Sequence, residues 1–282
     1  SPKESLVYAS SFGKKELREF WQKKIYLQNP SLEPNSISMP VVTDGMTHGL
    51  SIAAFLFGNP GDVLVTSDLH WENYDLIFRD CYDMRIATFP LLQGERFNIL
   101  GLQDSLSRSR SADRSVLVLF NFPHNPTGYA LSENEANEIV STLLDFAASG
   151  QHIVVLVDDA YFGLLYEEGL LEESLFARLA NLHERVLAVK IDGSSKEDFA
   201  WGLRVAFLTY GMKGLAPQDR IVLEEKTAAL VRATVSSVSH LAQSVLLSAY
   251  ESPTYRQEKK DRVKMLEERY FAFRKVINAH PE

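Results

Sequence analysis

Short apolar, β-branched runs alternate along the chain with longer stretches of helical periodicity. Two of the runs, 116–120 and 153–157, are continuously apolar, as expected for strands that are buried on both faces. The segments predicted to be strands are 62–66, 85–89, 115–121, 153–157, 185–191 and 204–209. Because strands alternate with helices, the pattern predicts an α/β fold in which helices cover both faces of a mostly parallel sheet, giving three α/β/α layers.

Helices are predicted between the strands, for example over 47–57, 71–81 and 132–148. Ser132 followed three residues later by Glu135 is typical of a capping box at the start of the last of these. Beyond Gly211 the pattern is helical and ends in a charged amphipathic stretch. We therefore predict a large domain over 1–250, and over 251–282 a long helix leading toward a small C-terminal domain that is largely absent.

Composition narrows the possible partners. Of 282 residues, 45% are hydrophobic, which is enough to build a large core. The 37 acidic and 29 basic residues give a net charge of -8, which argues against nucleic-acid and anionic-membrane partners. No apolar run is long enough to span a bilayer, and the single cysteine, Cys81, cannot form an internal disulfide, so we expect a cytoplasmic protein.

The two ends of the chain suggest a piece of a longer protein. The first residue is Ser1 instead of Met, and Glu282 falls inside the predicted terminal helix. We therefore expect sequence to be missing at both ends.

The candidate chemistry lies directly after the predicted strands, where ligands bind to sheets of this kind. Asn-Pro-Thr-Gly follows one strand at 125–128, and Asp-Asp-Ala-Tyr follows the next at 158–161. Gly-Ser-Ser-Lys follows a third at 193–196, with Arg204 eight residues after the lysine. Each motif is weak evidence alone, but the three in this order form a strong joint signal.

With these motifs the sequence resembles the fold-type I pyridoxal-phosphate (PLP) enzymes, specifically the class I and II aminotransferases, over nearly the whole chain. The resemblance implies that Lys196 forms the Schiff base with PLP and moves a proton during the reaction. It places Asp158 beside the ring nitrogen, which a carboxylate keeps protonated so that PLP can act as an electron sink. Asn125 and Tyr161 match the residues that hydrogen-bond the ring hydroxyl oxygen.

The resemblance also implies how the rest of the cofactor is held. An aromatic ring stacks on the pyridine face at the position of Trp71. The phosphate meets backbone N–H groups at a helix N-terminus and the planar fork of an arginine. The residues implied for the phosphate are Gly45, Met46, Thr47, Ser194, Ser195 and Arg204.

The sequence departs from the family pattern at two positions. Many relatives carry serine three residues before the lysine, where this chain has Gly193. Relatives more often have glycine two residues after the arginine, where this chain has Ala206. The first departure puts one phosphate contact in doubt, and Ser194 is the candidate to replace it.

Two further matches imply a homodimer with an active site shared between subunits. Tyr8 lies in a segment that looks like the one whose tyrosine reaches the phosphate of the neighbouring subunit. Arg232 lies where some relatives place an arginine that binds a dicarboxylic substrate, although an arginine on a helix usually faces solvent.

Transamination between an amino acid and a 2-oxo acid is the first functional hypothesis. A PLP-dependent C–S β-lyase shares every motif, and a PLP-binding sensor domain of a transcription regulator is the alternative from another class. In relatives the arginine that grips the substrate carboxylate lies in the small C-terminal domain, so we expect this chain alone to bind PLP weakly or moderately and to turn over poorly. The chain has neither a dinucleotide fingerprint nor a Walker phosphate loop, and its histidines lack zinc-ligand spacing, so no metal is expected.

Overall fold

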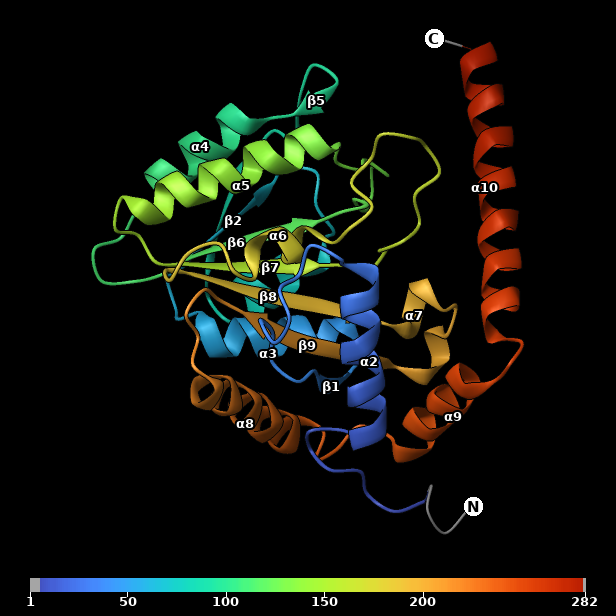
Figure 1. The fold of residues 1–282 in the computed structure, drawn as a ribbon. Coiled ribbons are helices and arrows are strands. Elements are labelled where there is room, and N and C mark those ends of the chain that lie inside the picture. The colour runs from blue at the N-terminus through green and yellow to red at the C-terminus, as the bar shows by residue number, and fades with distance from the viewer. Residues whose placement is uncertain (1–5, 281–282) are drawn as a thin grey trace.

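A seven-stranded sheet lies at the centre of the computed structural model, which describes residues 6–280 (Figure 1). The strand order is β1-β9-β8-β7-β6-β2-β3. Neighbours from β3 to β8 pair in parallel, whereas β9 pairs antiparallel with both β8 and β1. Within this sheet β9 is therefore the one strand that runs against the others. The strands of the sheet are β1 (Val41–Asp44), β2 (Val63–Ser67), β3 (Arg85–Phe89), β6 (Val116–Asn121), β7 (Ile153–Asp158), β8 (Val186–Gly193) and β9 (Val205–Gly211).

Helices cover both faces of this sheet. Figure 1 shows α4 and α5 on one side of it and α3 and α8 on the other, so the arrangement has three layers. A two-stranded hairpin of β4 (Leu92–Gln93) and β5 (Arg96–Phe97) stands apart from the main sheet. The helices are α2 (Lys15–Gln28), α3 (Met46–Phe57), η1 (Asp75–Cys81), α4 (Ile99–Arg108), α5 (Glu133–Ala148), α6 (Leu175–Leu179), α7 (Ser194–Glu197), η2 (Trp201–Leu203), α8 (Pro217–Thr234), α9 (His240–Glu251) and α10 (Tyr255–Ala279).

The core is built on the central strands. Every residue of β6 and β7 is buried, because helices pack on both faces of these strands. Trp21 of α2 adds an aromatic anchor: it is buried and stacks on Phe207 of β9 with ring centroids 4.2 Å apart. The predicted α/β/α class with a mostly parallel sheet is confirmed.

The predicted elements agree with the structure, with one correction. All six predicted strands are present, with ends that differ by no more than two residues. The strand β1 and the helix α2 were not predicted; β1 is only four residues long and gives little periodicity. The helix predicted over 71–81 is wrong at its start: its regular part, a π-helix, begins at Asp75 and leaves Trp71 in the preceding loop.

The capping box is confirmed at the start of α5. The Ser132 hydroxyl accepts from the Glu135 backbone N–H at 3.3 Å, and the Glu135 carboxylate accepts from the Ser132 N–H at 2.9 Å.

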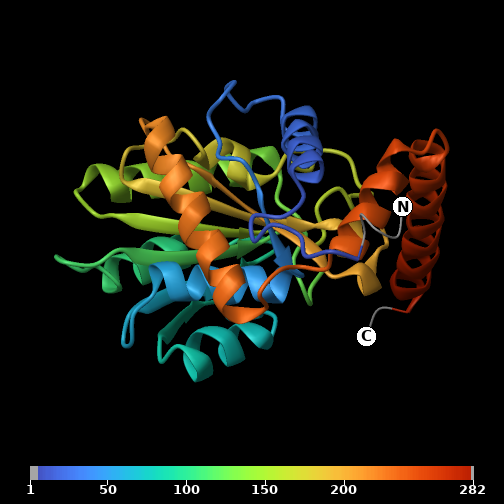
Figure 2. The ribbon, with the colours of Figure 1, turned by 90° about the horizontal axis from the view of Figure 1, so that it is seen from below.

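The predicted charged helix is present as α10, and it lies at one edge of the molecule beside α9 (Figure 1, Figure 2). None of its side chains is buried. In the part of the chain that the structure describes, no helix is both long and apolar enough to cross a membrane. The division into two domains remains a prediction.

Candidate active site

A cavity of about 230 Å³ opens at the carboxyl ends of β6, β7 and β8, where the sequence predicted the chemistry. It brings together most of the residues predicted for the cofactor, although they come from segments far apart in the chain. The lining residues are Met46, Thr47, Trp71, Tyr74, Asn121, Asn125, Asp158, Ala160, Tyr161, Ser195, Lys196 and Arg204.

Asp158 ends β7 and is buried in the wall of this cavity. One carboxylate oxygen accepts from the Tyr74 hydroxyl at 2.6 Å, and the other accepts from the Ala160 backbone N–H at 3.1 Å. Burial raises the pKa of Asp158 to about 6, against the lowering effect of these two hydrogen bonds. The carboxylate is therefore held in a fixed orientation, ready to pair with a positive group.

The next residue, Asp159, is equally buried but does not line the cavity. Its carboxylate accepts from the Ser174 hydroxyl at 2.6 Å and forms a buried ion pair with Lys190 of β8. The choice of Asp158 over Asp159 as the site carboxylate agrees with this geometry.

Two asparagines fix the turn that carries the Asn-Pro-Thr-Gly motif. The Asn121 amide donates to the Asp158 backbone carbonyl at 2.8 Å, and its carbonyl oxygen accepts from the Asn125 N–H at 2.8 Å. The motif is thereby tied to the end of β7. Asn125 lines the cavity, as does Trp71, whose ring meets Tyr74 edge-on at 5.7 Å.

Lys196 lies in α7, a single turn that directly follows β8. Its ammonium lies 5.9 Å from the centre of the Tyr161 ring. Within residues 6–280 this ammonium has no hydrogen-bond or ion-pair partner, so a lysine stands free in the cavity. Burial, and next the nearby Asp158 carboxylate, raise the pKa of Tyr161, so this phenol keeps its proton.

An anion cradle lies at the N-terminus of α3. The helix begins after Gly45, whose φ of 79° favours glycine. A side chain at Gly45 would overlap the guanidinium of Arg204, so the glycine leaves room for that group beside the free N–H groups of the helix. The Ser195 hydroxyl is buried and unpaired among the described residues. Apart from a 3.3 Å bond from Arg204 to the Trp201 carbonyl, the Arg204 guanidinium and the Ser195 hydroxyl have no acceptor among the described residues, as expected for an anion site.

Ser194 does not line this cavity. Its hydroxyl is buried and donates to the Val205 carbonyl at 3.1 Å, so the prediction that Ser194 replaces the missing phosphate contact has no support in the geometry.

The two departures from the family pattern are coupled in space. Gly193 pairs with Ala206 across β8 and β9, and a Cβ added at Gly193 would lie 2.7 Å from the Ala206 Cβ. The same Cβ would lie 2.8 Å from the Ala206 Cα and 2.9 Å from the Val205 carbonyl oxygen, so a serine at 193 does not fit this backbone.

Tyr8 and Arg232 lie outside the cavity. Tyr8 is 85% exposed, and Arg232 is exposed on α8, where it donates to the Ser236 hydroxyl at 3.2 Å. Neither residue lines the cavity of its own chain.

Tyr74 and Asn121 were missed as site residues. A signal for Asn121 was present in the sequence, because it is the last residue of a predicted strand at the edge where ligands bind. Tyr74 had no such signal, because only the fold brings its hydroxyl to Asp158.

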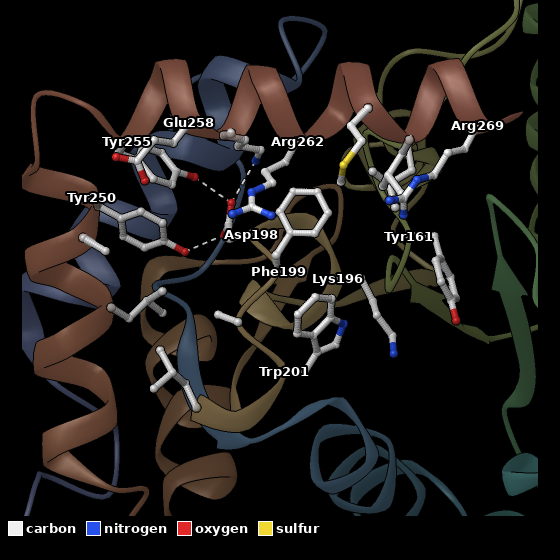
Figure 3. A pocket seen from close by; sticks show the side chains of 18 residues that line it. Tyr161, Lys196, Asp198, Phe199, Trp201, Tyr250, Tyr255, Glu258, Arg262 and Arg269 are labelled. Carbon is white, nitrogen blue, oxygen red and sulfur yellow. Dashed lines mark hydrogen bonds and ion pairs between the residues drawn. The ribbon is translucent and has the colours of Figure 1, made fainter. Parts of the chain in front are cut away.

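A larger cavity of about 610 Å³ adjoins this site at Tyr161 and Lys196 and lies beneath α10 (Figure 3). Figure 3 shows Lys196 pointing away from α10, and Arg262 and Arg269 extending from α10 toward the cavity. Between residues 6 and 280, no group of three or more His, Cys, Asp or Glu side chains is placed to hold a metal ion.

Comparison with known proteins gives one consistent result. A family model described as aminotransferase class I and II matches residues 2–280. A probable N-acetyl-LL-diaminopimelate aminotransferase of Bacillus subtilis (strain 168) is 24% identical over 243 residues, which are 86% of this chain and 55% of that protein. An aspartate aminotransferase of Sulfolobus acidocaldarius is 22% identical over 250 residues, covering 87% of this chain and 56% of that protein.

Solved structures agree in fold. The crystal structure of an aminotransferase from Anaerococcus prevotii DSM 20548 has a TM-score of 0.88 and 26% identity, covering 99% of this chain and 68% of that chain. A kynurenine aminotransferase from Pyrococcus horikoshii, solved in complex with PMP, has a TM-score of 0.80 and 19% identity, covering 98% and 63%. The chain spans about half the length of the curated relatives it matches.

Proposed function

The chain belongs to the aminotransferase class I and II family, and we propose that it is the cofactor-binding part of a PLP-dependent aminotransferase with Lys196 as the attachment point of the cofactor. Membership confirms the resemblance seen in the sequence. Aminotransferases of fold-type I generally depend on PLP, and relatives of this chain are named as aminotransferases.

One observation carries the proposal: three kinds of unpaired or poised group meet in one cavity. They are the free ammonium of Lys196, the buried carboxylate of Asp158 and the donors around Gly45. PLP has an aldehyde, a ring nitrogen and a phosphate, and these need an amine, an anion and an anion cradle, respectively. The residues present therefore fit the cofactor.

Bound PLP would supply the electron sink that an amino-group transfer needs. Asp158 would hold a proton on the ring nitrogen, because an ionised carboxylate stabilises a neighbouring positive charge. The Tyr74 hydroxyl and the Ala160 N–H keep both carboxylate oxygens in place for this. With PLP bound, the Lys196 amine would be the group in the cavity that can accept and return a proton.

The other residues that line the cavity would bind the phosphate and the ring of PLP. Arg204, Ser195 and the N–H groups at Met46 and Thr47 would hold the phosphate, with the planar guanidinium able to bond two oxygens at once. Trp71 would lie against the ring face, and Asn125 and Tyr161 would bond its hydroxyl oxygen.

The proposed substrates are an amino acid and a 2-oxo acid, bound in a homodimer. Because Tyr8 and Arg232 are exposed and lie outside the cavity of their own chain, their proposed roles require the partner subunit. In that arrangement Tyr8 would bond the phosphate of the neighbouring site, and Arg232 would favour a dicarboxylic substrate.

Visible absorption spectra of the chain with added PLP test the proposal. We expect the wild-type chain to gain the visible band of a lysine–PLP linkage and Lys196→Ala to lack it. Lys213→Ala is the matched control, because Lys213 is an exposed lysine that does not line the cavity. A band that persists in Lys196→Ala, or a wild type without a band, would contradict the assignment.

Product analysis then identifies the reaction. Formation of a 2-oxo acid from an added amino acid, with transfer of the amino group to a second 2-oxo acid, supports transamination. Release of pyruvate and a thiol from a cysteine conjugate would instead identify a C–S lyase.

A further inference from the structure

Two buried carboxylates directly follow Lys196 in the chain, and two lysines from distant helices pair with them. Glu197 is 4% exposed, and the side chain of Asp198 is 2% exposed. Lys24 of α2 lies 3.0 Å from the Glu197 carboxylate and 3.1 Å from that of Asp198. Lys259 of α10 lies 2.7 Å and 2.8 Å from the same two groups. Two carboxylates thus face two ammonium groups, and the charges balance.

Neutral donors complete the shell around these carboxylates. The hydroxyls of Tyr250 and Tyr255 donate to Asp198 at 2.7 Å and 2.6 Å (Figure 3), and the Gln28 amide donates to Glu197 at 2.7 Å. We call this set the carboxylate cluster: Lys24, Glu197, Asp198, Tyr250, Tyr255 and Lys259.

Both carboxylates are held ionised inside the protein. Burial alone would raise the pKa of Glu197 and of Asp198, but Lys24 and Lys259 outweigh it and hold both values below the ordinary range. Removing one lysine would therefore leave a negative charge that is buried and unbalanced.

The carboxylate cluster is bonded to the turn that carries Lys196. The helix α7 has only four residues, and Lys196 is followed at once by the two anchored carboxylates. The Asp198 N–H donates to the Ser194 carbonyl and the Phe199 N–H to the Lys196 carbonyl, each at 3.2 Å. These bonds hold the backbone from which the Lys196 side chain extends toward the Tyr161 ring.

The same contacts attach α10 to the site. None of the α10 side chains is buried, yet Tyr255 and Lys259 in its first two turns reach the carboxylates beside Lys196. Lys24 reaches the same carboxylates from α2, which lies far away in the sequence.

We propose that Lys24 and Lys259 are positioning residues for Lys196: by anchoring and neutralising the buried carboxylates of Glu197 and Asp198 they fix the α7 turn that presents its amine. The inference rests on the proposed role of Lys196.

The test measures how fast Lys196 reacts with a small amine-acylating reagent in the chain without cofactor, read by mass spectrometry of the peptide that contains it. We expect Lys24→Met and Lys259→Met to slow acylation several-fold, because the turn that presents Lys196 loses one of the two cations that anchor it. The sequence offers matched controls in Lys23→Met and Lys260→Met, because each is the exposed neighbour of a cluster lysine. Lys259→Arg keeps the charge and should restore the rate.

A milder variant keeps the test decisive where a charge-removing variant does not fold. Tyr255→Phe removes one donor to Asp198 without a change in charge, and we expect acylation about two-fold slower. If Tyr255→Phe and every folded lysine variant acylate Lys196 at the wild-type rate while their melting temperatures fall, the carboxylate cluster only stabilises the fold and the inference is wrong.

The same samples separate this inference from the proposed function. A wild-type chain that forms no visible band with PLP contradicts the function, whatever the acylation rates are. A wild-type band together with unchanged acylation in the cluster variants contradicts the positioning role alone.

Discussion

The two sides of the Lys196 turn differ in how their polar groups are satisfied. Toward the cavity, the Ser195 hydroxyl is buried and unpaired among the described residues, and Arg204 makes one long bond, of 3.3 Å, to the Trp201 carbonyl. On the other side, Glu197 and Asp198 are surrounded by donors from three helices, α2, α9 and α10.

This difference separates a ligand site from a scaffold. A buried polar group without a partner costs free energy, so a cavity that gathers several of them is best explained by a ligand that completes their bonds. A saturated cluster leaves no bond for a ligand and instead fixes the backbone. Asp158 and Asp159 repeat the contrast one strand away, since Asp159 is paired with Lys190 whereas Asp158 has no cation partner between residues 6 and 280.

The largest expected effect is a difference in stability between variants of two lysines, Lys190 and Lys196. Lys190→Met leaves Asp159 and Asp192 buried without their cation, and we expect the free energy of unfolding to fall by about 3–5 kcal/mol. Lys196→Met removes an ammonium that has no partner in the described chain, and we expect a loss below about 1 kcal/mol. Urea unfolding of the cofactor-free chain measures both.

The result for Lys196→Met decides whether Lys196 belongs to the ligand site or to the scaffold. A loss as large as that of Lys190→Met would mean that Lys196 belongs to the scaffold, and the contrast between the two sides of the turn would fail.

Much of the fold could be predicted because local patterns and global structure agree. The buried strands β6 and β7 are continuously apolar, so their pattern has one interpretation. The helix that ends at Cys81 was predicted to begin at Trp71, four residues before η1 begins, because a π-helix does not follow the periodicity of an α-helix. The short strand β1 depends on pairing with β9, which is more than 150 residues away in sequence.

The site was predictable where it lies at strand ends and not where it depends on packing. Asp158, Lys196 and Arg204 stand in motifs that a sequence displays. The Tyr74 hydroxyl reaches Asp158 only through tertiary structure. Which of Ser194 and Ser195 faces the cavity also depends on tertiary structure, because the Val205 carbonyl accepts a hydrogen bond from the Ser194 hydroxyl.

A smaller effect is expected from pH at Asp158. Its pKa rises from an ordinary 3.8 to about 6 on burial, so the folded state binds this proton more tightly than the unfolded state. Stability from this group is therefore present below pH 4 and lost as the pH rises through about 6. Asp158→Asn has no charge to bury, so its free energy of unfolding relative to wild type should increase by roughly 1.5 kcal/mol from pH 5 to pH 8.

Urea unfolding at the two pH values measures this change in the cofactor-free chain. Asp145→Asn is the control, since Asp145 is exposed on α5. Its replacement should change the free energy of unfolding by the same amount at both pH values. If the difference in free energy of unfolding between Asp158→Asn and wild type is the same at both pH values, the pKa of Asp158 is not raised in the folded state.

The smallest effect divides two adjacent serines. Ser194→Ala removes a hydroxyl that donates to Val205, and we expect it to lower the free energy of unfolding by about 1 kcal/mol without a change in PLP affinity. Ser195→Ala removes a buried hydroxyl that lacks a partner among the described residues, so the cofactor-free chain should be as stable as wild type or more stable by up to about 1 kcal/mol.

We expect Ser195→Ala to lower ligand affinity only when the ligand carries a phosphate. We expect PLP affinity to fall about ten-fold, the value of one hydrogen bond to a charged group, and pyridoxal affinity to stay unchanged. Titrations of both variants with PLP and with pyridoxal, which lacks the phosphate, measure this. An equal loss for the two ligands would mean that Ser195 does not contact the phosphate, and a loss of stability would mean that its hydroxyl belongs with the saturated side of the turn.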